Sequence, residues 1–260
     1  MKIITVATEK NGYFHSLQES ANKFNYDLIV LGYGEKWKGF GWRVKLILEY
    51  IKTLPKNEII VMVDAYDVII LRDSNELKDF FIKLNVKFLC GAFRKLDGLL
   101  GICQEIEFGK TKNNIQPPYN NLCAGTWIST VDYAISIYNN LYINDNKDDQ
   151  VILNQIYDYN NDLITPDFNF NIFCTLFPTI FTRQIRDIDK IHITSDKKLY
   201  CGVTNTYPFI LHGLGNTDLT LILNKLDFNN KNNYTSFKYI IKKLFYHIKL
   251  ITYTFFKNRW

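Results

Sequence analysis

The stretch that decides the fold reads Ile59-Ile60-Val61-Met62-Val63-Asp64-Ala65-Tyr66-Asp67-Val68-Ile69-Ile70-Leu71. Its first five residues are apolar and mostly β-branched, which predicts a strand buried on both faces. Asp64 and Asp67 follow at the carboxyl end of that strand, where ligands bind in open α/β sheets. Two carboxylates three residues apart can converge on one divalent cation. A capped turn would explain the pair equally well, because Asp hydrogen-bonds its own backbone after strands.

Strands and helices alternate on both sides of this stretch. Short apolar runs predict further strands at residues 3–8, 28–31, 88–93 and 122–129. Apolar residues at helical spacing predict helices at residues 13–25, 43–54, 74–84, 131–142 and 148–159. The alternation predicts an α/β fold, with a parallel sheet covered by helices on both faces. The segment 94–119 has no clean period and is expected to carry a substrate-facing loop.

Composition excludes several classes of protein. The 260 residues carry a net charge of +5, but residues 231–260 contain seven Lys or Arg and no acid, so the body has a net charge of −2. A body that binds nucleic acid is therefore not expected. The first residues form too short an apolar run for a signal peptide, and five scattered cysteines fit reduced thiols. We expect an intracellular protein without a spanning helix.

A series of short motifs occurs in order along the chain: Thr5-Val6-Ala7-Thr8, Gly12-Tyr13, Phe24-Asn25-Tyr26, Leu31-Gly32-Tyr33-Gly34-Glu35-Lys36-Trp37-Lys38-Gly39, Val63-Asp64-Ala65-Tyr66-Asp67-Val68, Asp148-Asp149-Gln150 and Leu211-His212-Gly213-Leu214-Gly215-Asn216-Thr217. Together and in register, these motifs resemble the glycosyltransferase domain of the multifunctional procollagen lysyl hydroxylases. The resemblance implies a free-standing GT-A domain at residues 1–230. Its fold would be a Rossmann-related mixed sheet flanked by helices, followed by a C-terminal amphipathic helix at residues 231–260.

The resemblance implies a metal site made of Asp64, Asp67 and His212. In that family, such residues bind Mn²⁺, which holds the diphosphate of a UDP-sugar donor. Imidazole together with carboxylates suits Mn²⁺ better than Mg²⁺, which remains the alternative. A single His after a strand is otherwise more often a structural residue.

Six residues are implied to contact the donor nucleotide. Tyr66 and Trp37 match aromatic residues near the base, and Thr8 ends the first predicted strand close to the nucleoside. Arg43 matches a basic residue that contacts phosphate, and Gly213 and Gly215 would let backbone amides approach phosphate. The two aromatic residues could equally be ordinary core residues in a chain that is 15% aromatic.

Asp148 and Asp149 match an acidic cluster near the sugar and the acceptor. A carboxylate there could orient the acceptor hydroxyl or stabilise an oxocarbenium-like state. The alternative is an exposed helix N-terminus, where Asp is favoured. Residues 123–126, Cys-Ala-Gly-Thr, resemble the small-residue turn that lines the donor sugar, although small residues also suit a tight strand crossing.

The resemblance implies transfer of a hexose from a UDP-sugar, glucose first and galactose next, to a hydroxyl acceptor. Hydroxylysine-linked galactose on a collagen-like protein is one acceptor. The alternatives are a glycan- or lipid-directed glycosyltransferase and a non-catalytic UDP-sugar-binding scaffold. The acceptor side differs from the family, because Cys90-Gly91-Ala92-Phe93-Arg94-Lys95 has neither Trp nor Pro. Asp218 also replaces a family Lys that could face the diphosphate.

The basic tail carries one apolar stripe at helical spacing. Its residues are Phe237, Ile241, Leu244, Ile248, Ile251 and Phe255. Such a helix could lie on an anionic membrane surface as a peripheral anchor. It could instead pack on the domain or on a partner subunit, including a second copy of the chain.

Overall fold

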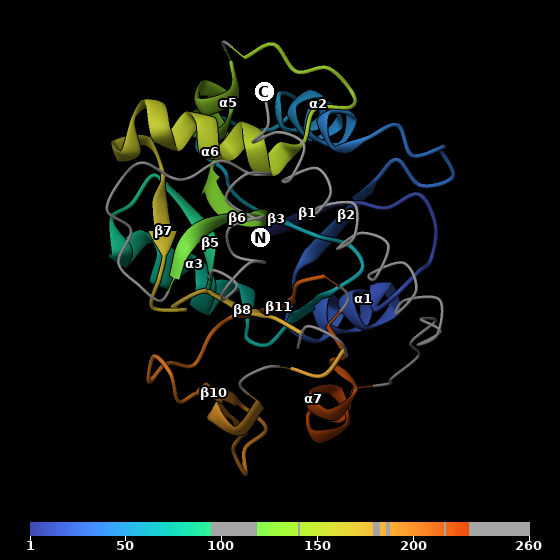
Figure 1. The fold of residues 1–260 in the computed structure, drawn as a ribbon, viewed down its shortest axis with the longest axis vertical. Coiled ribbons are helices and arrows are strands. Elements are labelled where there is room, and N and C mark those ends of the chain that lie inside the picture. The colour runs from blue at the N-terminus through green and yellow to red at the C-terminus, as the bar shows by residue number, and fades with distance from the viewer. Residues whose placement is uncertain (95–118, 140, 179–182, 186–187, 216, 229–260) are drawn as a thin grey trace, which may run out of the picture.

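The computed structural model describes residues 1–94, 119–139, 141–178, 183–185, 188–215 and 217–228 (Figure 1). The expected loop at 94–119 and the tail at 231–260 lie almost wholly outside these residues. Among the described residues, no helix combines the length and apolar character needed to cross a membrane.

A six-stranded sheet runs through the middle of the molecule in the order β2-β1-β3-β6-β5-β7 (Figure 1). Its strands are β1 (Lys2–Val6), β2 (Asp27–Leu31), β3 (Ile59–Val63), β5 (Phe88–Arg94), β6 (Tyr119–Thr130) and β7 (Thr165–Asp167). The first three are parallel, and β6 runs antiparallel to both β3 and β5. The sheet is therefore mixed, as the family resemblance implied, and not parallel throughout, as the alternation alone suggested.

Helices cover both faces of the sheet, as expected. One face packs on α2 (Phe40–Ile51), α5 (Val131–Tyr138) and α6 (Asp149–Tyr159), which lie together in Figure 1. The other face packs on α1 (Phe14–Lys23) and α3 (Ser74–Leu84). The five helices predicted between residues 13 and 159 are thus confirmed, with ends shifted by up to four residues.

A second, three-stranded sheet in the order β4-β11-β8 lies beneath the first. It consists of β4 (Val68–Ile70), β8 (Phe173–Leu176) and β11 (Ile210–Gly213). The remaining elements are the hairpin of β9 (Ile191–Ile193) and β10 (Leu199–Cys201), the 3₁₀ turns Asn161–Leu163 and Ile188–Lys190, and α7 (Thr220–Lys225). The chain passes from the first sheet to the second through the turn that links β3 to β4, so Asp64 and Asp67 lie where the two sheets meet.

Candidate metal centre

The turn between β3 and β4 brings Asp64 and Asp67 to His212 on β11. Because β4 runs antiparallel to β11 with Val68 opposite His212, the residue before β4 lies beside the histidine. The Gly213 amide donates to the Asp67 carbonyl (2.8 Å) and fixes the turn against β11. His212 Nε2 lies 3.5 Å from Asp64 Oδ2 and 3.4 Å from Asp67 Oδ1. The three residues expected to bind metal therefore form one cluster.

The cluster fits a divalent cation. One ligand atom from each of Asp64, Asp67 and His212 lies within 4.8 Å of the others. His212 is fully buried, and among the described residues its Nε2 has no hydrogen-bond partner. A buried nitrogen without a partner is costly unless something binds it. Two carboxylates and one imidazole are ligands that Mn²⁺ accepts.

Charges inside the cluster compensate one another. Burial opposes ionisation of Asp64, but Arg43 and His212 outweigh it and hold the pKa of Asp64 at about 2. Burial raises the pKa of Asp67, and His212 opposes that shift. Burial disfavours the imidazolium of His212, yet Cys123 and the two carboxylates raise its pKa well above 6.5. Without a cation, a proton on His212 thus balances the carboxylates.

A β-bulge on β6 closes one side of the cluster. The pairing of β6 with β5 skips residues 124–126, and the Asp64 amide donates to the Gly125 carbonyl in this bulge (2.8 Å). A Cβ atom on Gly125 would overlap Asp64 Oδ2 and lie 2.6 Å from His212 Cε1. The glycine in this small-residue turn therefore has a steric reason, because a larger residue would overlap Asp64 and His212.

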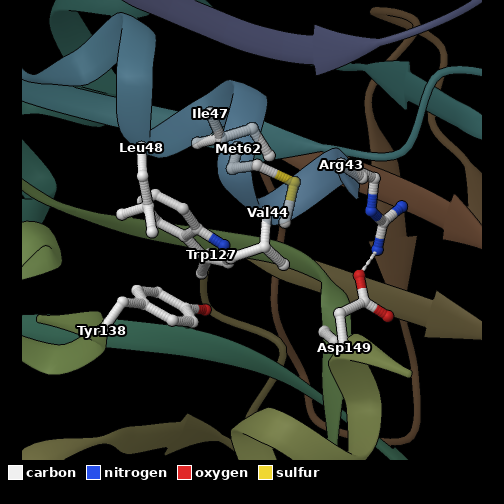
Figure 2. A pocket seen from close by; sticks show the side chains of 9 residues that line it. Arg43, Val44, Ile47, Leu48, Met62, Trp127, Tyr138 and Asp149 are labelled. Carbon is white, nitrogen blue, oxygen red and sulfur yellow. Dashed lines mark hydrogen bonds and ion pairs between the residues drawn. The ribbon is translucent and has the colours of Figure 1, made fainter. Parts of the chain in front are cut away.

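Arg43 on α2 connects the cluster of Asp64, Asp67 and His212 to the acidic pair at the start of α6. One terminal nitrogen donates to Asp64 and the other to Asp149, and all three side chains are largely buried. Figure 2 shows the guanidinium directed at Asp149, at one end of a crevice with apolar walls that include Val44 and Trp127. Both terminal nitrogens of Arg43 are paired with carboxylates, and its expected contact with phosphate remains a prediction.

The two residues of the acidic cluster differ in their surroundings. Asp148 is the N-cap of α6, and its Oδ1 accepts from the amides of Gln150 (2.8 Å) and Val151 (3.3 Å). Asp149 points the other way, into the crevice beside Arg43 (Figure 2). Burial raises the pKa of Asp149, and Arg43 opposes that shift. Their catalytic roles remain predictions.

Tyr66 and Thr8 connect the acidic turn to the end of β1. The Tyr66 hydroxyl accepts from the Thr8 amide at 3.1 Å, and its ring meets Phe14 edge-on. The Thr8 carbonyl in turn accepts from the Gly34 amide (2.9 Å), which holds the loop after β2 against β1. Both residues therefore lie beside the metal cluster, and their contacts with a nucleoside remain predictions.

Trp37 lies in that same loop and is 41% exposed. Its ring meets Phe40 and Trp42 edge-on, so it is held in place while much of its surface faces solvent. Such a ring is suited to stacking on a planar ligand. The stacking itself stays a prediction.

The two glycines after His212 have different surroundings. The Gly213 amide already donates to Asp67, and a Cβ there would lie 2.9 Å from the Leu219 side chain. Gly213 therefore allows close packing at the end of β11, and its contact with phosphate remains a prediction. Gly215 has φ of +61°, and a Cβ there would meet no atom of the described residues within 4 Å, which leaves room for a ligand on this side.

Two residues at the site, Gln150 and Asp218, make contacts that the sequence did not predict. The Gln150 side chain accepts from the Ala124 amide (3.0 Å) and donates to the Leu122 carbonyl (2.8 Å), so it holds the β6 bulge. Its place in the Asp-Asp-Gln motif was the available signal. Asp218, where the family has Lys, accepts from the Tyr13 hydroxyl (3.0 Å) and from the Thr220 amide (3.0 Å), which fixes the start of α7.

Comparisons with known proteins show the family of the chain. The PLOD GT domain family model matches residues 1–243. Procollagen-lysine,2-oxoglutarate 5-dioxygenase 2 of Mus musculus is 30% identical over 165 residues, covering 60% of this chain and 22% of that protein. The human multifunctional procollagen lysine hydroxylase and glycosyltransferase LH3 is 26% identical over 236 residues, covering 84% of this chain and 30% of that protein. The chain spans about a fifth to a third of the length of these relatives.

Solved structures of similar shape include two glycosyltransferases. One, involved in glycosylation of the major capsid of PBCV-1, has a TM-score of 0.43 at 11% identity and covers 87% of this chain and 98% of that chain. The other, the galactosyltransferase LgtC with donor and acceptor sugar analogs, has a TM-score of 0.44 at 12% identity, covering 89% and 98%. These scores are too low to carry an argument about function. The PLOD GT domain model matches residues 1–243, which is most of the chain, and the chain therefore belongs to the PLOD GT domain family of glycosyltransferases.

Proposed function

We propose that the protein transfers a hexose from a UDP-sugar to a hydroxyl acceptor with the help of Mn²⁺. The convergence of Asp64, Asp67 and His212 at the junction of the two sheets carries this proposal. It supports cation binding in a domain whose family is already known. Glucose is the favoured sugar and galactose the next, by resemblance to the family.

The metal residues would hold the cation against the donor diphosphate. A bound divalent cation stabilises negative charge as a nucleoside diphosphate departs. Asp64 stays ionised because Arg43 and His212 offset its burial. The side chains of Trp37 and Tyr66, with Thr8, would position the nucleoside on the neighbouring loop, and the turn at Gly215 leaves room for phosphate.

Asp149 is the carboxylate best placed to act on the sugar or the acceptor. Arg43 links it directly to Asp64, a member of the proposed metal site. A carboxylate there could orient the acceptor hydroxyl or stabilise positive charge at the anomeric carbon. Asp148 contributes by starting α6, which aims Asp149 at Arg43.

The acceptor is proposed as a hydroxyl on a protein or a glycan, with hydroxylysine-linked galactose on a collagen-like protein as the first candidate. The test is UDP release from UDP-glucose and UDP-galactose with Mn²⁺, in the presence of galactosyl-hydroxylysine peptide, free glycan or lipid-linked sugar. We expect Mn²⁺-dependent release that one acceptor class stimulates. Tight UDP binding with no release from any donor would favour the scaffold alternative.

A further inference from the structure

His212 has a second buried neighbour that the metal site does not explain. Its Nδ1 lies 3.4 Å from the Sγ atom of Cys123, on the side of the ring opposite the carboxylates. At most 1% of the surface of either residue is exposed. The contact joins β6 to β11 across 89 residues of sequence, so it depends on the fold and on no local pattern.

The contact matters because, in a neutral imidazole, a proton on one nitrogen leaves the lone pair on the other. To offer the lone pair of Nε2 to a cation, the neutral ring must carry its proton on Nδ1. That N–H then needs an acceptor, which metal-bound histidines usually find in a carboxylate, a carbonyl or water. Here Cys123 Sγ lies within hydrogen-bond distance of Nδ1, whereas Nε2 has no hydrogen-bond partner among the described residues.

We propose that Cys123 is a positioning residue for the metal ligand His212: its sulfur accepts the Nδ1 proton and so presents the Nε2 lone pair to the cation. The inference rests on the proposed function, since it concerns the same cation site. Sulfur is a weak acceptor, so the bond acts by fixing the tautomer and the orientation of the ring.

The backbone around Cys123 keeps the thiol in place. Cys123 is the last residue before the skipped positions of the β6 bulge, and it pairs with Gly91 on β5. Gln150 donates to the Leu122 carbonyl and accepts from the Ala124 amide, on either side of Cys123. The sulfur therefore reaches Nδ1 without depending on a mobile side chain.

The test compares Mn²⁺ affinity, measured from the EPR signal of free Mn²⁺, across three variants. Cys123→Val fills the same space with no acceptor and should raise the Kd roughly 10- to 100-fold, the loss typical of removing such a partner. Cys123→Ser restores an acceptor and should stay within about threefold of wild type. Cys90→Val is the control for loss of a buried thiol: the Cys90 thiol donates to the carbonyls of Gly91 (3.0 Å) and Cys123 (3.6 Å), so this variant leaves the contact between Cys123 Sγ and His212 Nδ1 in place.

Thermal unfolding of the metal-free variants separates positioning from a purely structural role. The Mn²⁺ affinity of Cys123→Ser, which keeps an acceptor, should exceed that of Cys123→Val, even if Cys123→Ser is the less stable variant. Cys123→Ala replaces Val if Val does not fold, with the same expected loss. Equal affinity of Val and wild type, or equal losses in Ser and Val, would overturn the inference alone. A wild-type protein that binds no Mn²⁺ would overturn the proposed function as well.

Discussion

Two pairs of aspartates, Asp64 with Asp67 and Asp148 with Asp149, carry the predicted chemistry, and the structure places them in different ways. The first pair lies in a turn between two sheets, so both carboxylates face His212. The second pair begins a helix, where Asp148 caps the backbone and only Asp149 faces the site. Spacing alone therefore does not tell what two acids do, because the backbone between them decides whether they converge.

The largest effect should follow from removing a carboxylate of the first pair. Asp64→Asn or Asp67→Asn should lower Mn²⁺-dependent UDP release by roughly 100- to 1000-fold, because the charge that binds the cation is lost. Asp196→Asn, at a distant exposed position, should leave the rate unchanged. Turnover within threefold of wild type in both site variants would contradict the metal assignment.

Removing Asp149 should test the buried link between the two pairs. Asp149→Asn leaves Arg43 with Asp64 as its one remaining carboxylate partner among the described residues. We expect a loss of about 2–3 kcal/mol in the free energy of unfolding, less than for a buried charge left without any partner. Urea denaturation of the metal-free protein measures it, and a loss below about 0.5 kcal/mol would show that the link does not stabilise the fold.

A methyl group at the β6 bulge should disturb the first pair alone. Gly125→Ala places its Cβ against Asp64 Oδ2 and His212 Cε1, so Mn²⁺ affinity should fall at least about tenfold. Gly34→Ala is the control: its methyl meets no atom within 4 Å, and its φ of +83° affects stability only. Calorimetric titration with Mn²⁺ compares the two, and equal affinities would refute the steric argument.

The pH dependence of metal binding should report His212. Its pKa lies well above 6.5 without metal, so near neutral pH the cation must displace a proton. Affinity should then rise with pH, by up to about tenfold per unit, until His212 is neutral. The raised pKa also means that stability from the imidazolium is present below pH 6.5 and is lost as the pH passes the folded-state value. His212→Gln should flatten the affinity profile, and a profile unchanged by that variant would assign the proton elsewhere.

The smallest effect should come from the cap of α6. Asp148→Ala removes the acceptor for the Gln150 and Val151 amides and should cost about 1 kcal/mol of stability. Catalytic turnover should fall much less than in Asp149→Asn, which removes the carboxylate proposed to act on the sugar or the acceptor. A loss of turnover as large in Asp148→Ala would restore Asp148 to a direct catalytic role.

Local patterns were enough to predict the elements. Apolar runs located β3 and β5, and helical spacing located α1, α3 and α6, because burial on one face repeats with a fixed period. The antiparallel course of β6 was not visible locally, since a strand buried on both faces has the same sequence pattern in either direction.

The site could be predicted where a motif fixes the backbone, as for Asp64, Asp67 and His212. It could not be predicted where partners meet only through the fold. Arg43 and Asp149 are separated by 106 residues, and Cys123 and His212 by 89. Such pairs follow from the order of the strands, which no local spacing encodes.

The most direct measurement is anomalous diffraction from a crystal of the protein with Mn²⁺ and UDP. The account predicts one strong manganese peak within bonding distance, about 2.0–2.2 Å, of Asp64, Asp67 and His212. The UDP diphosphate should contact the same ion. A peak at other residues, or UDP bound with no manganese at this cluster, would contradict the account.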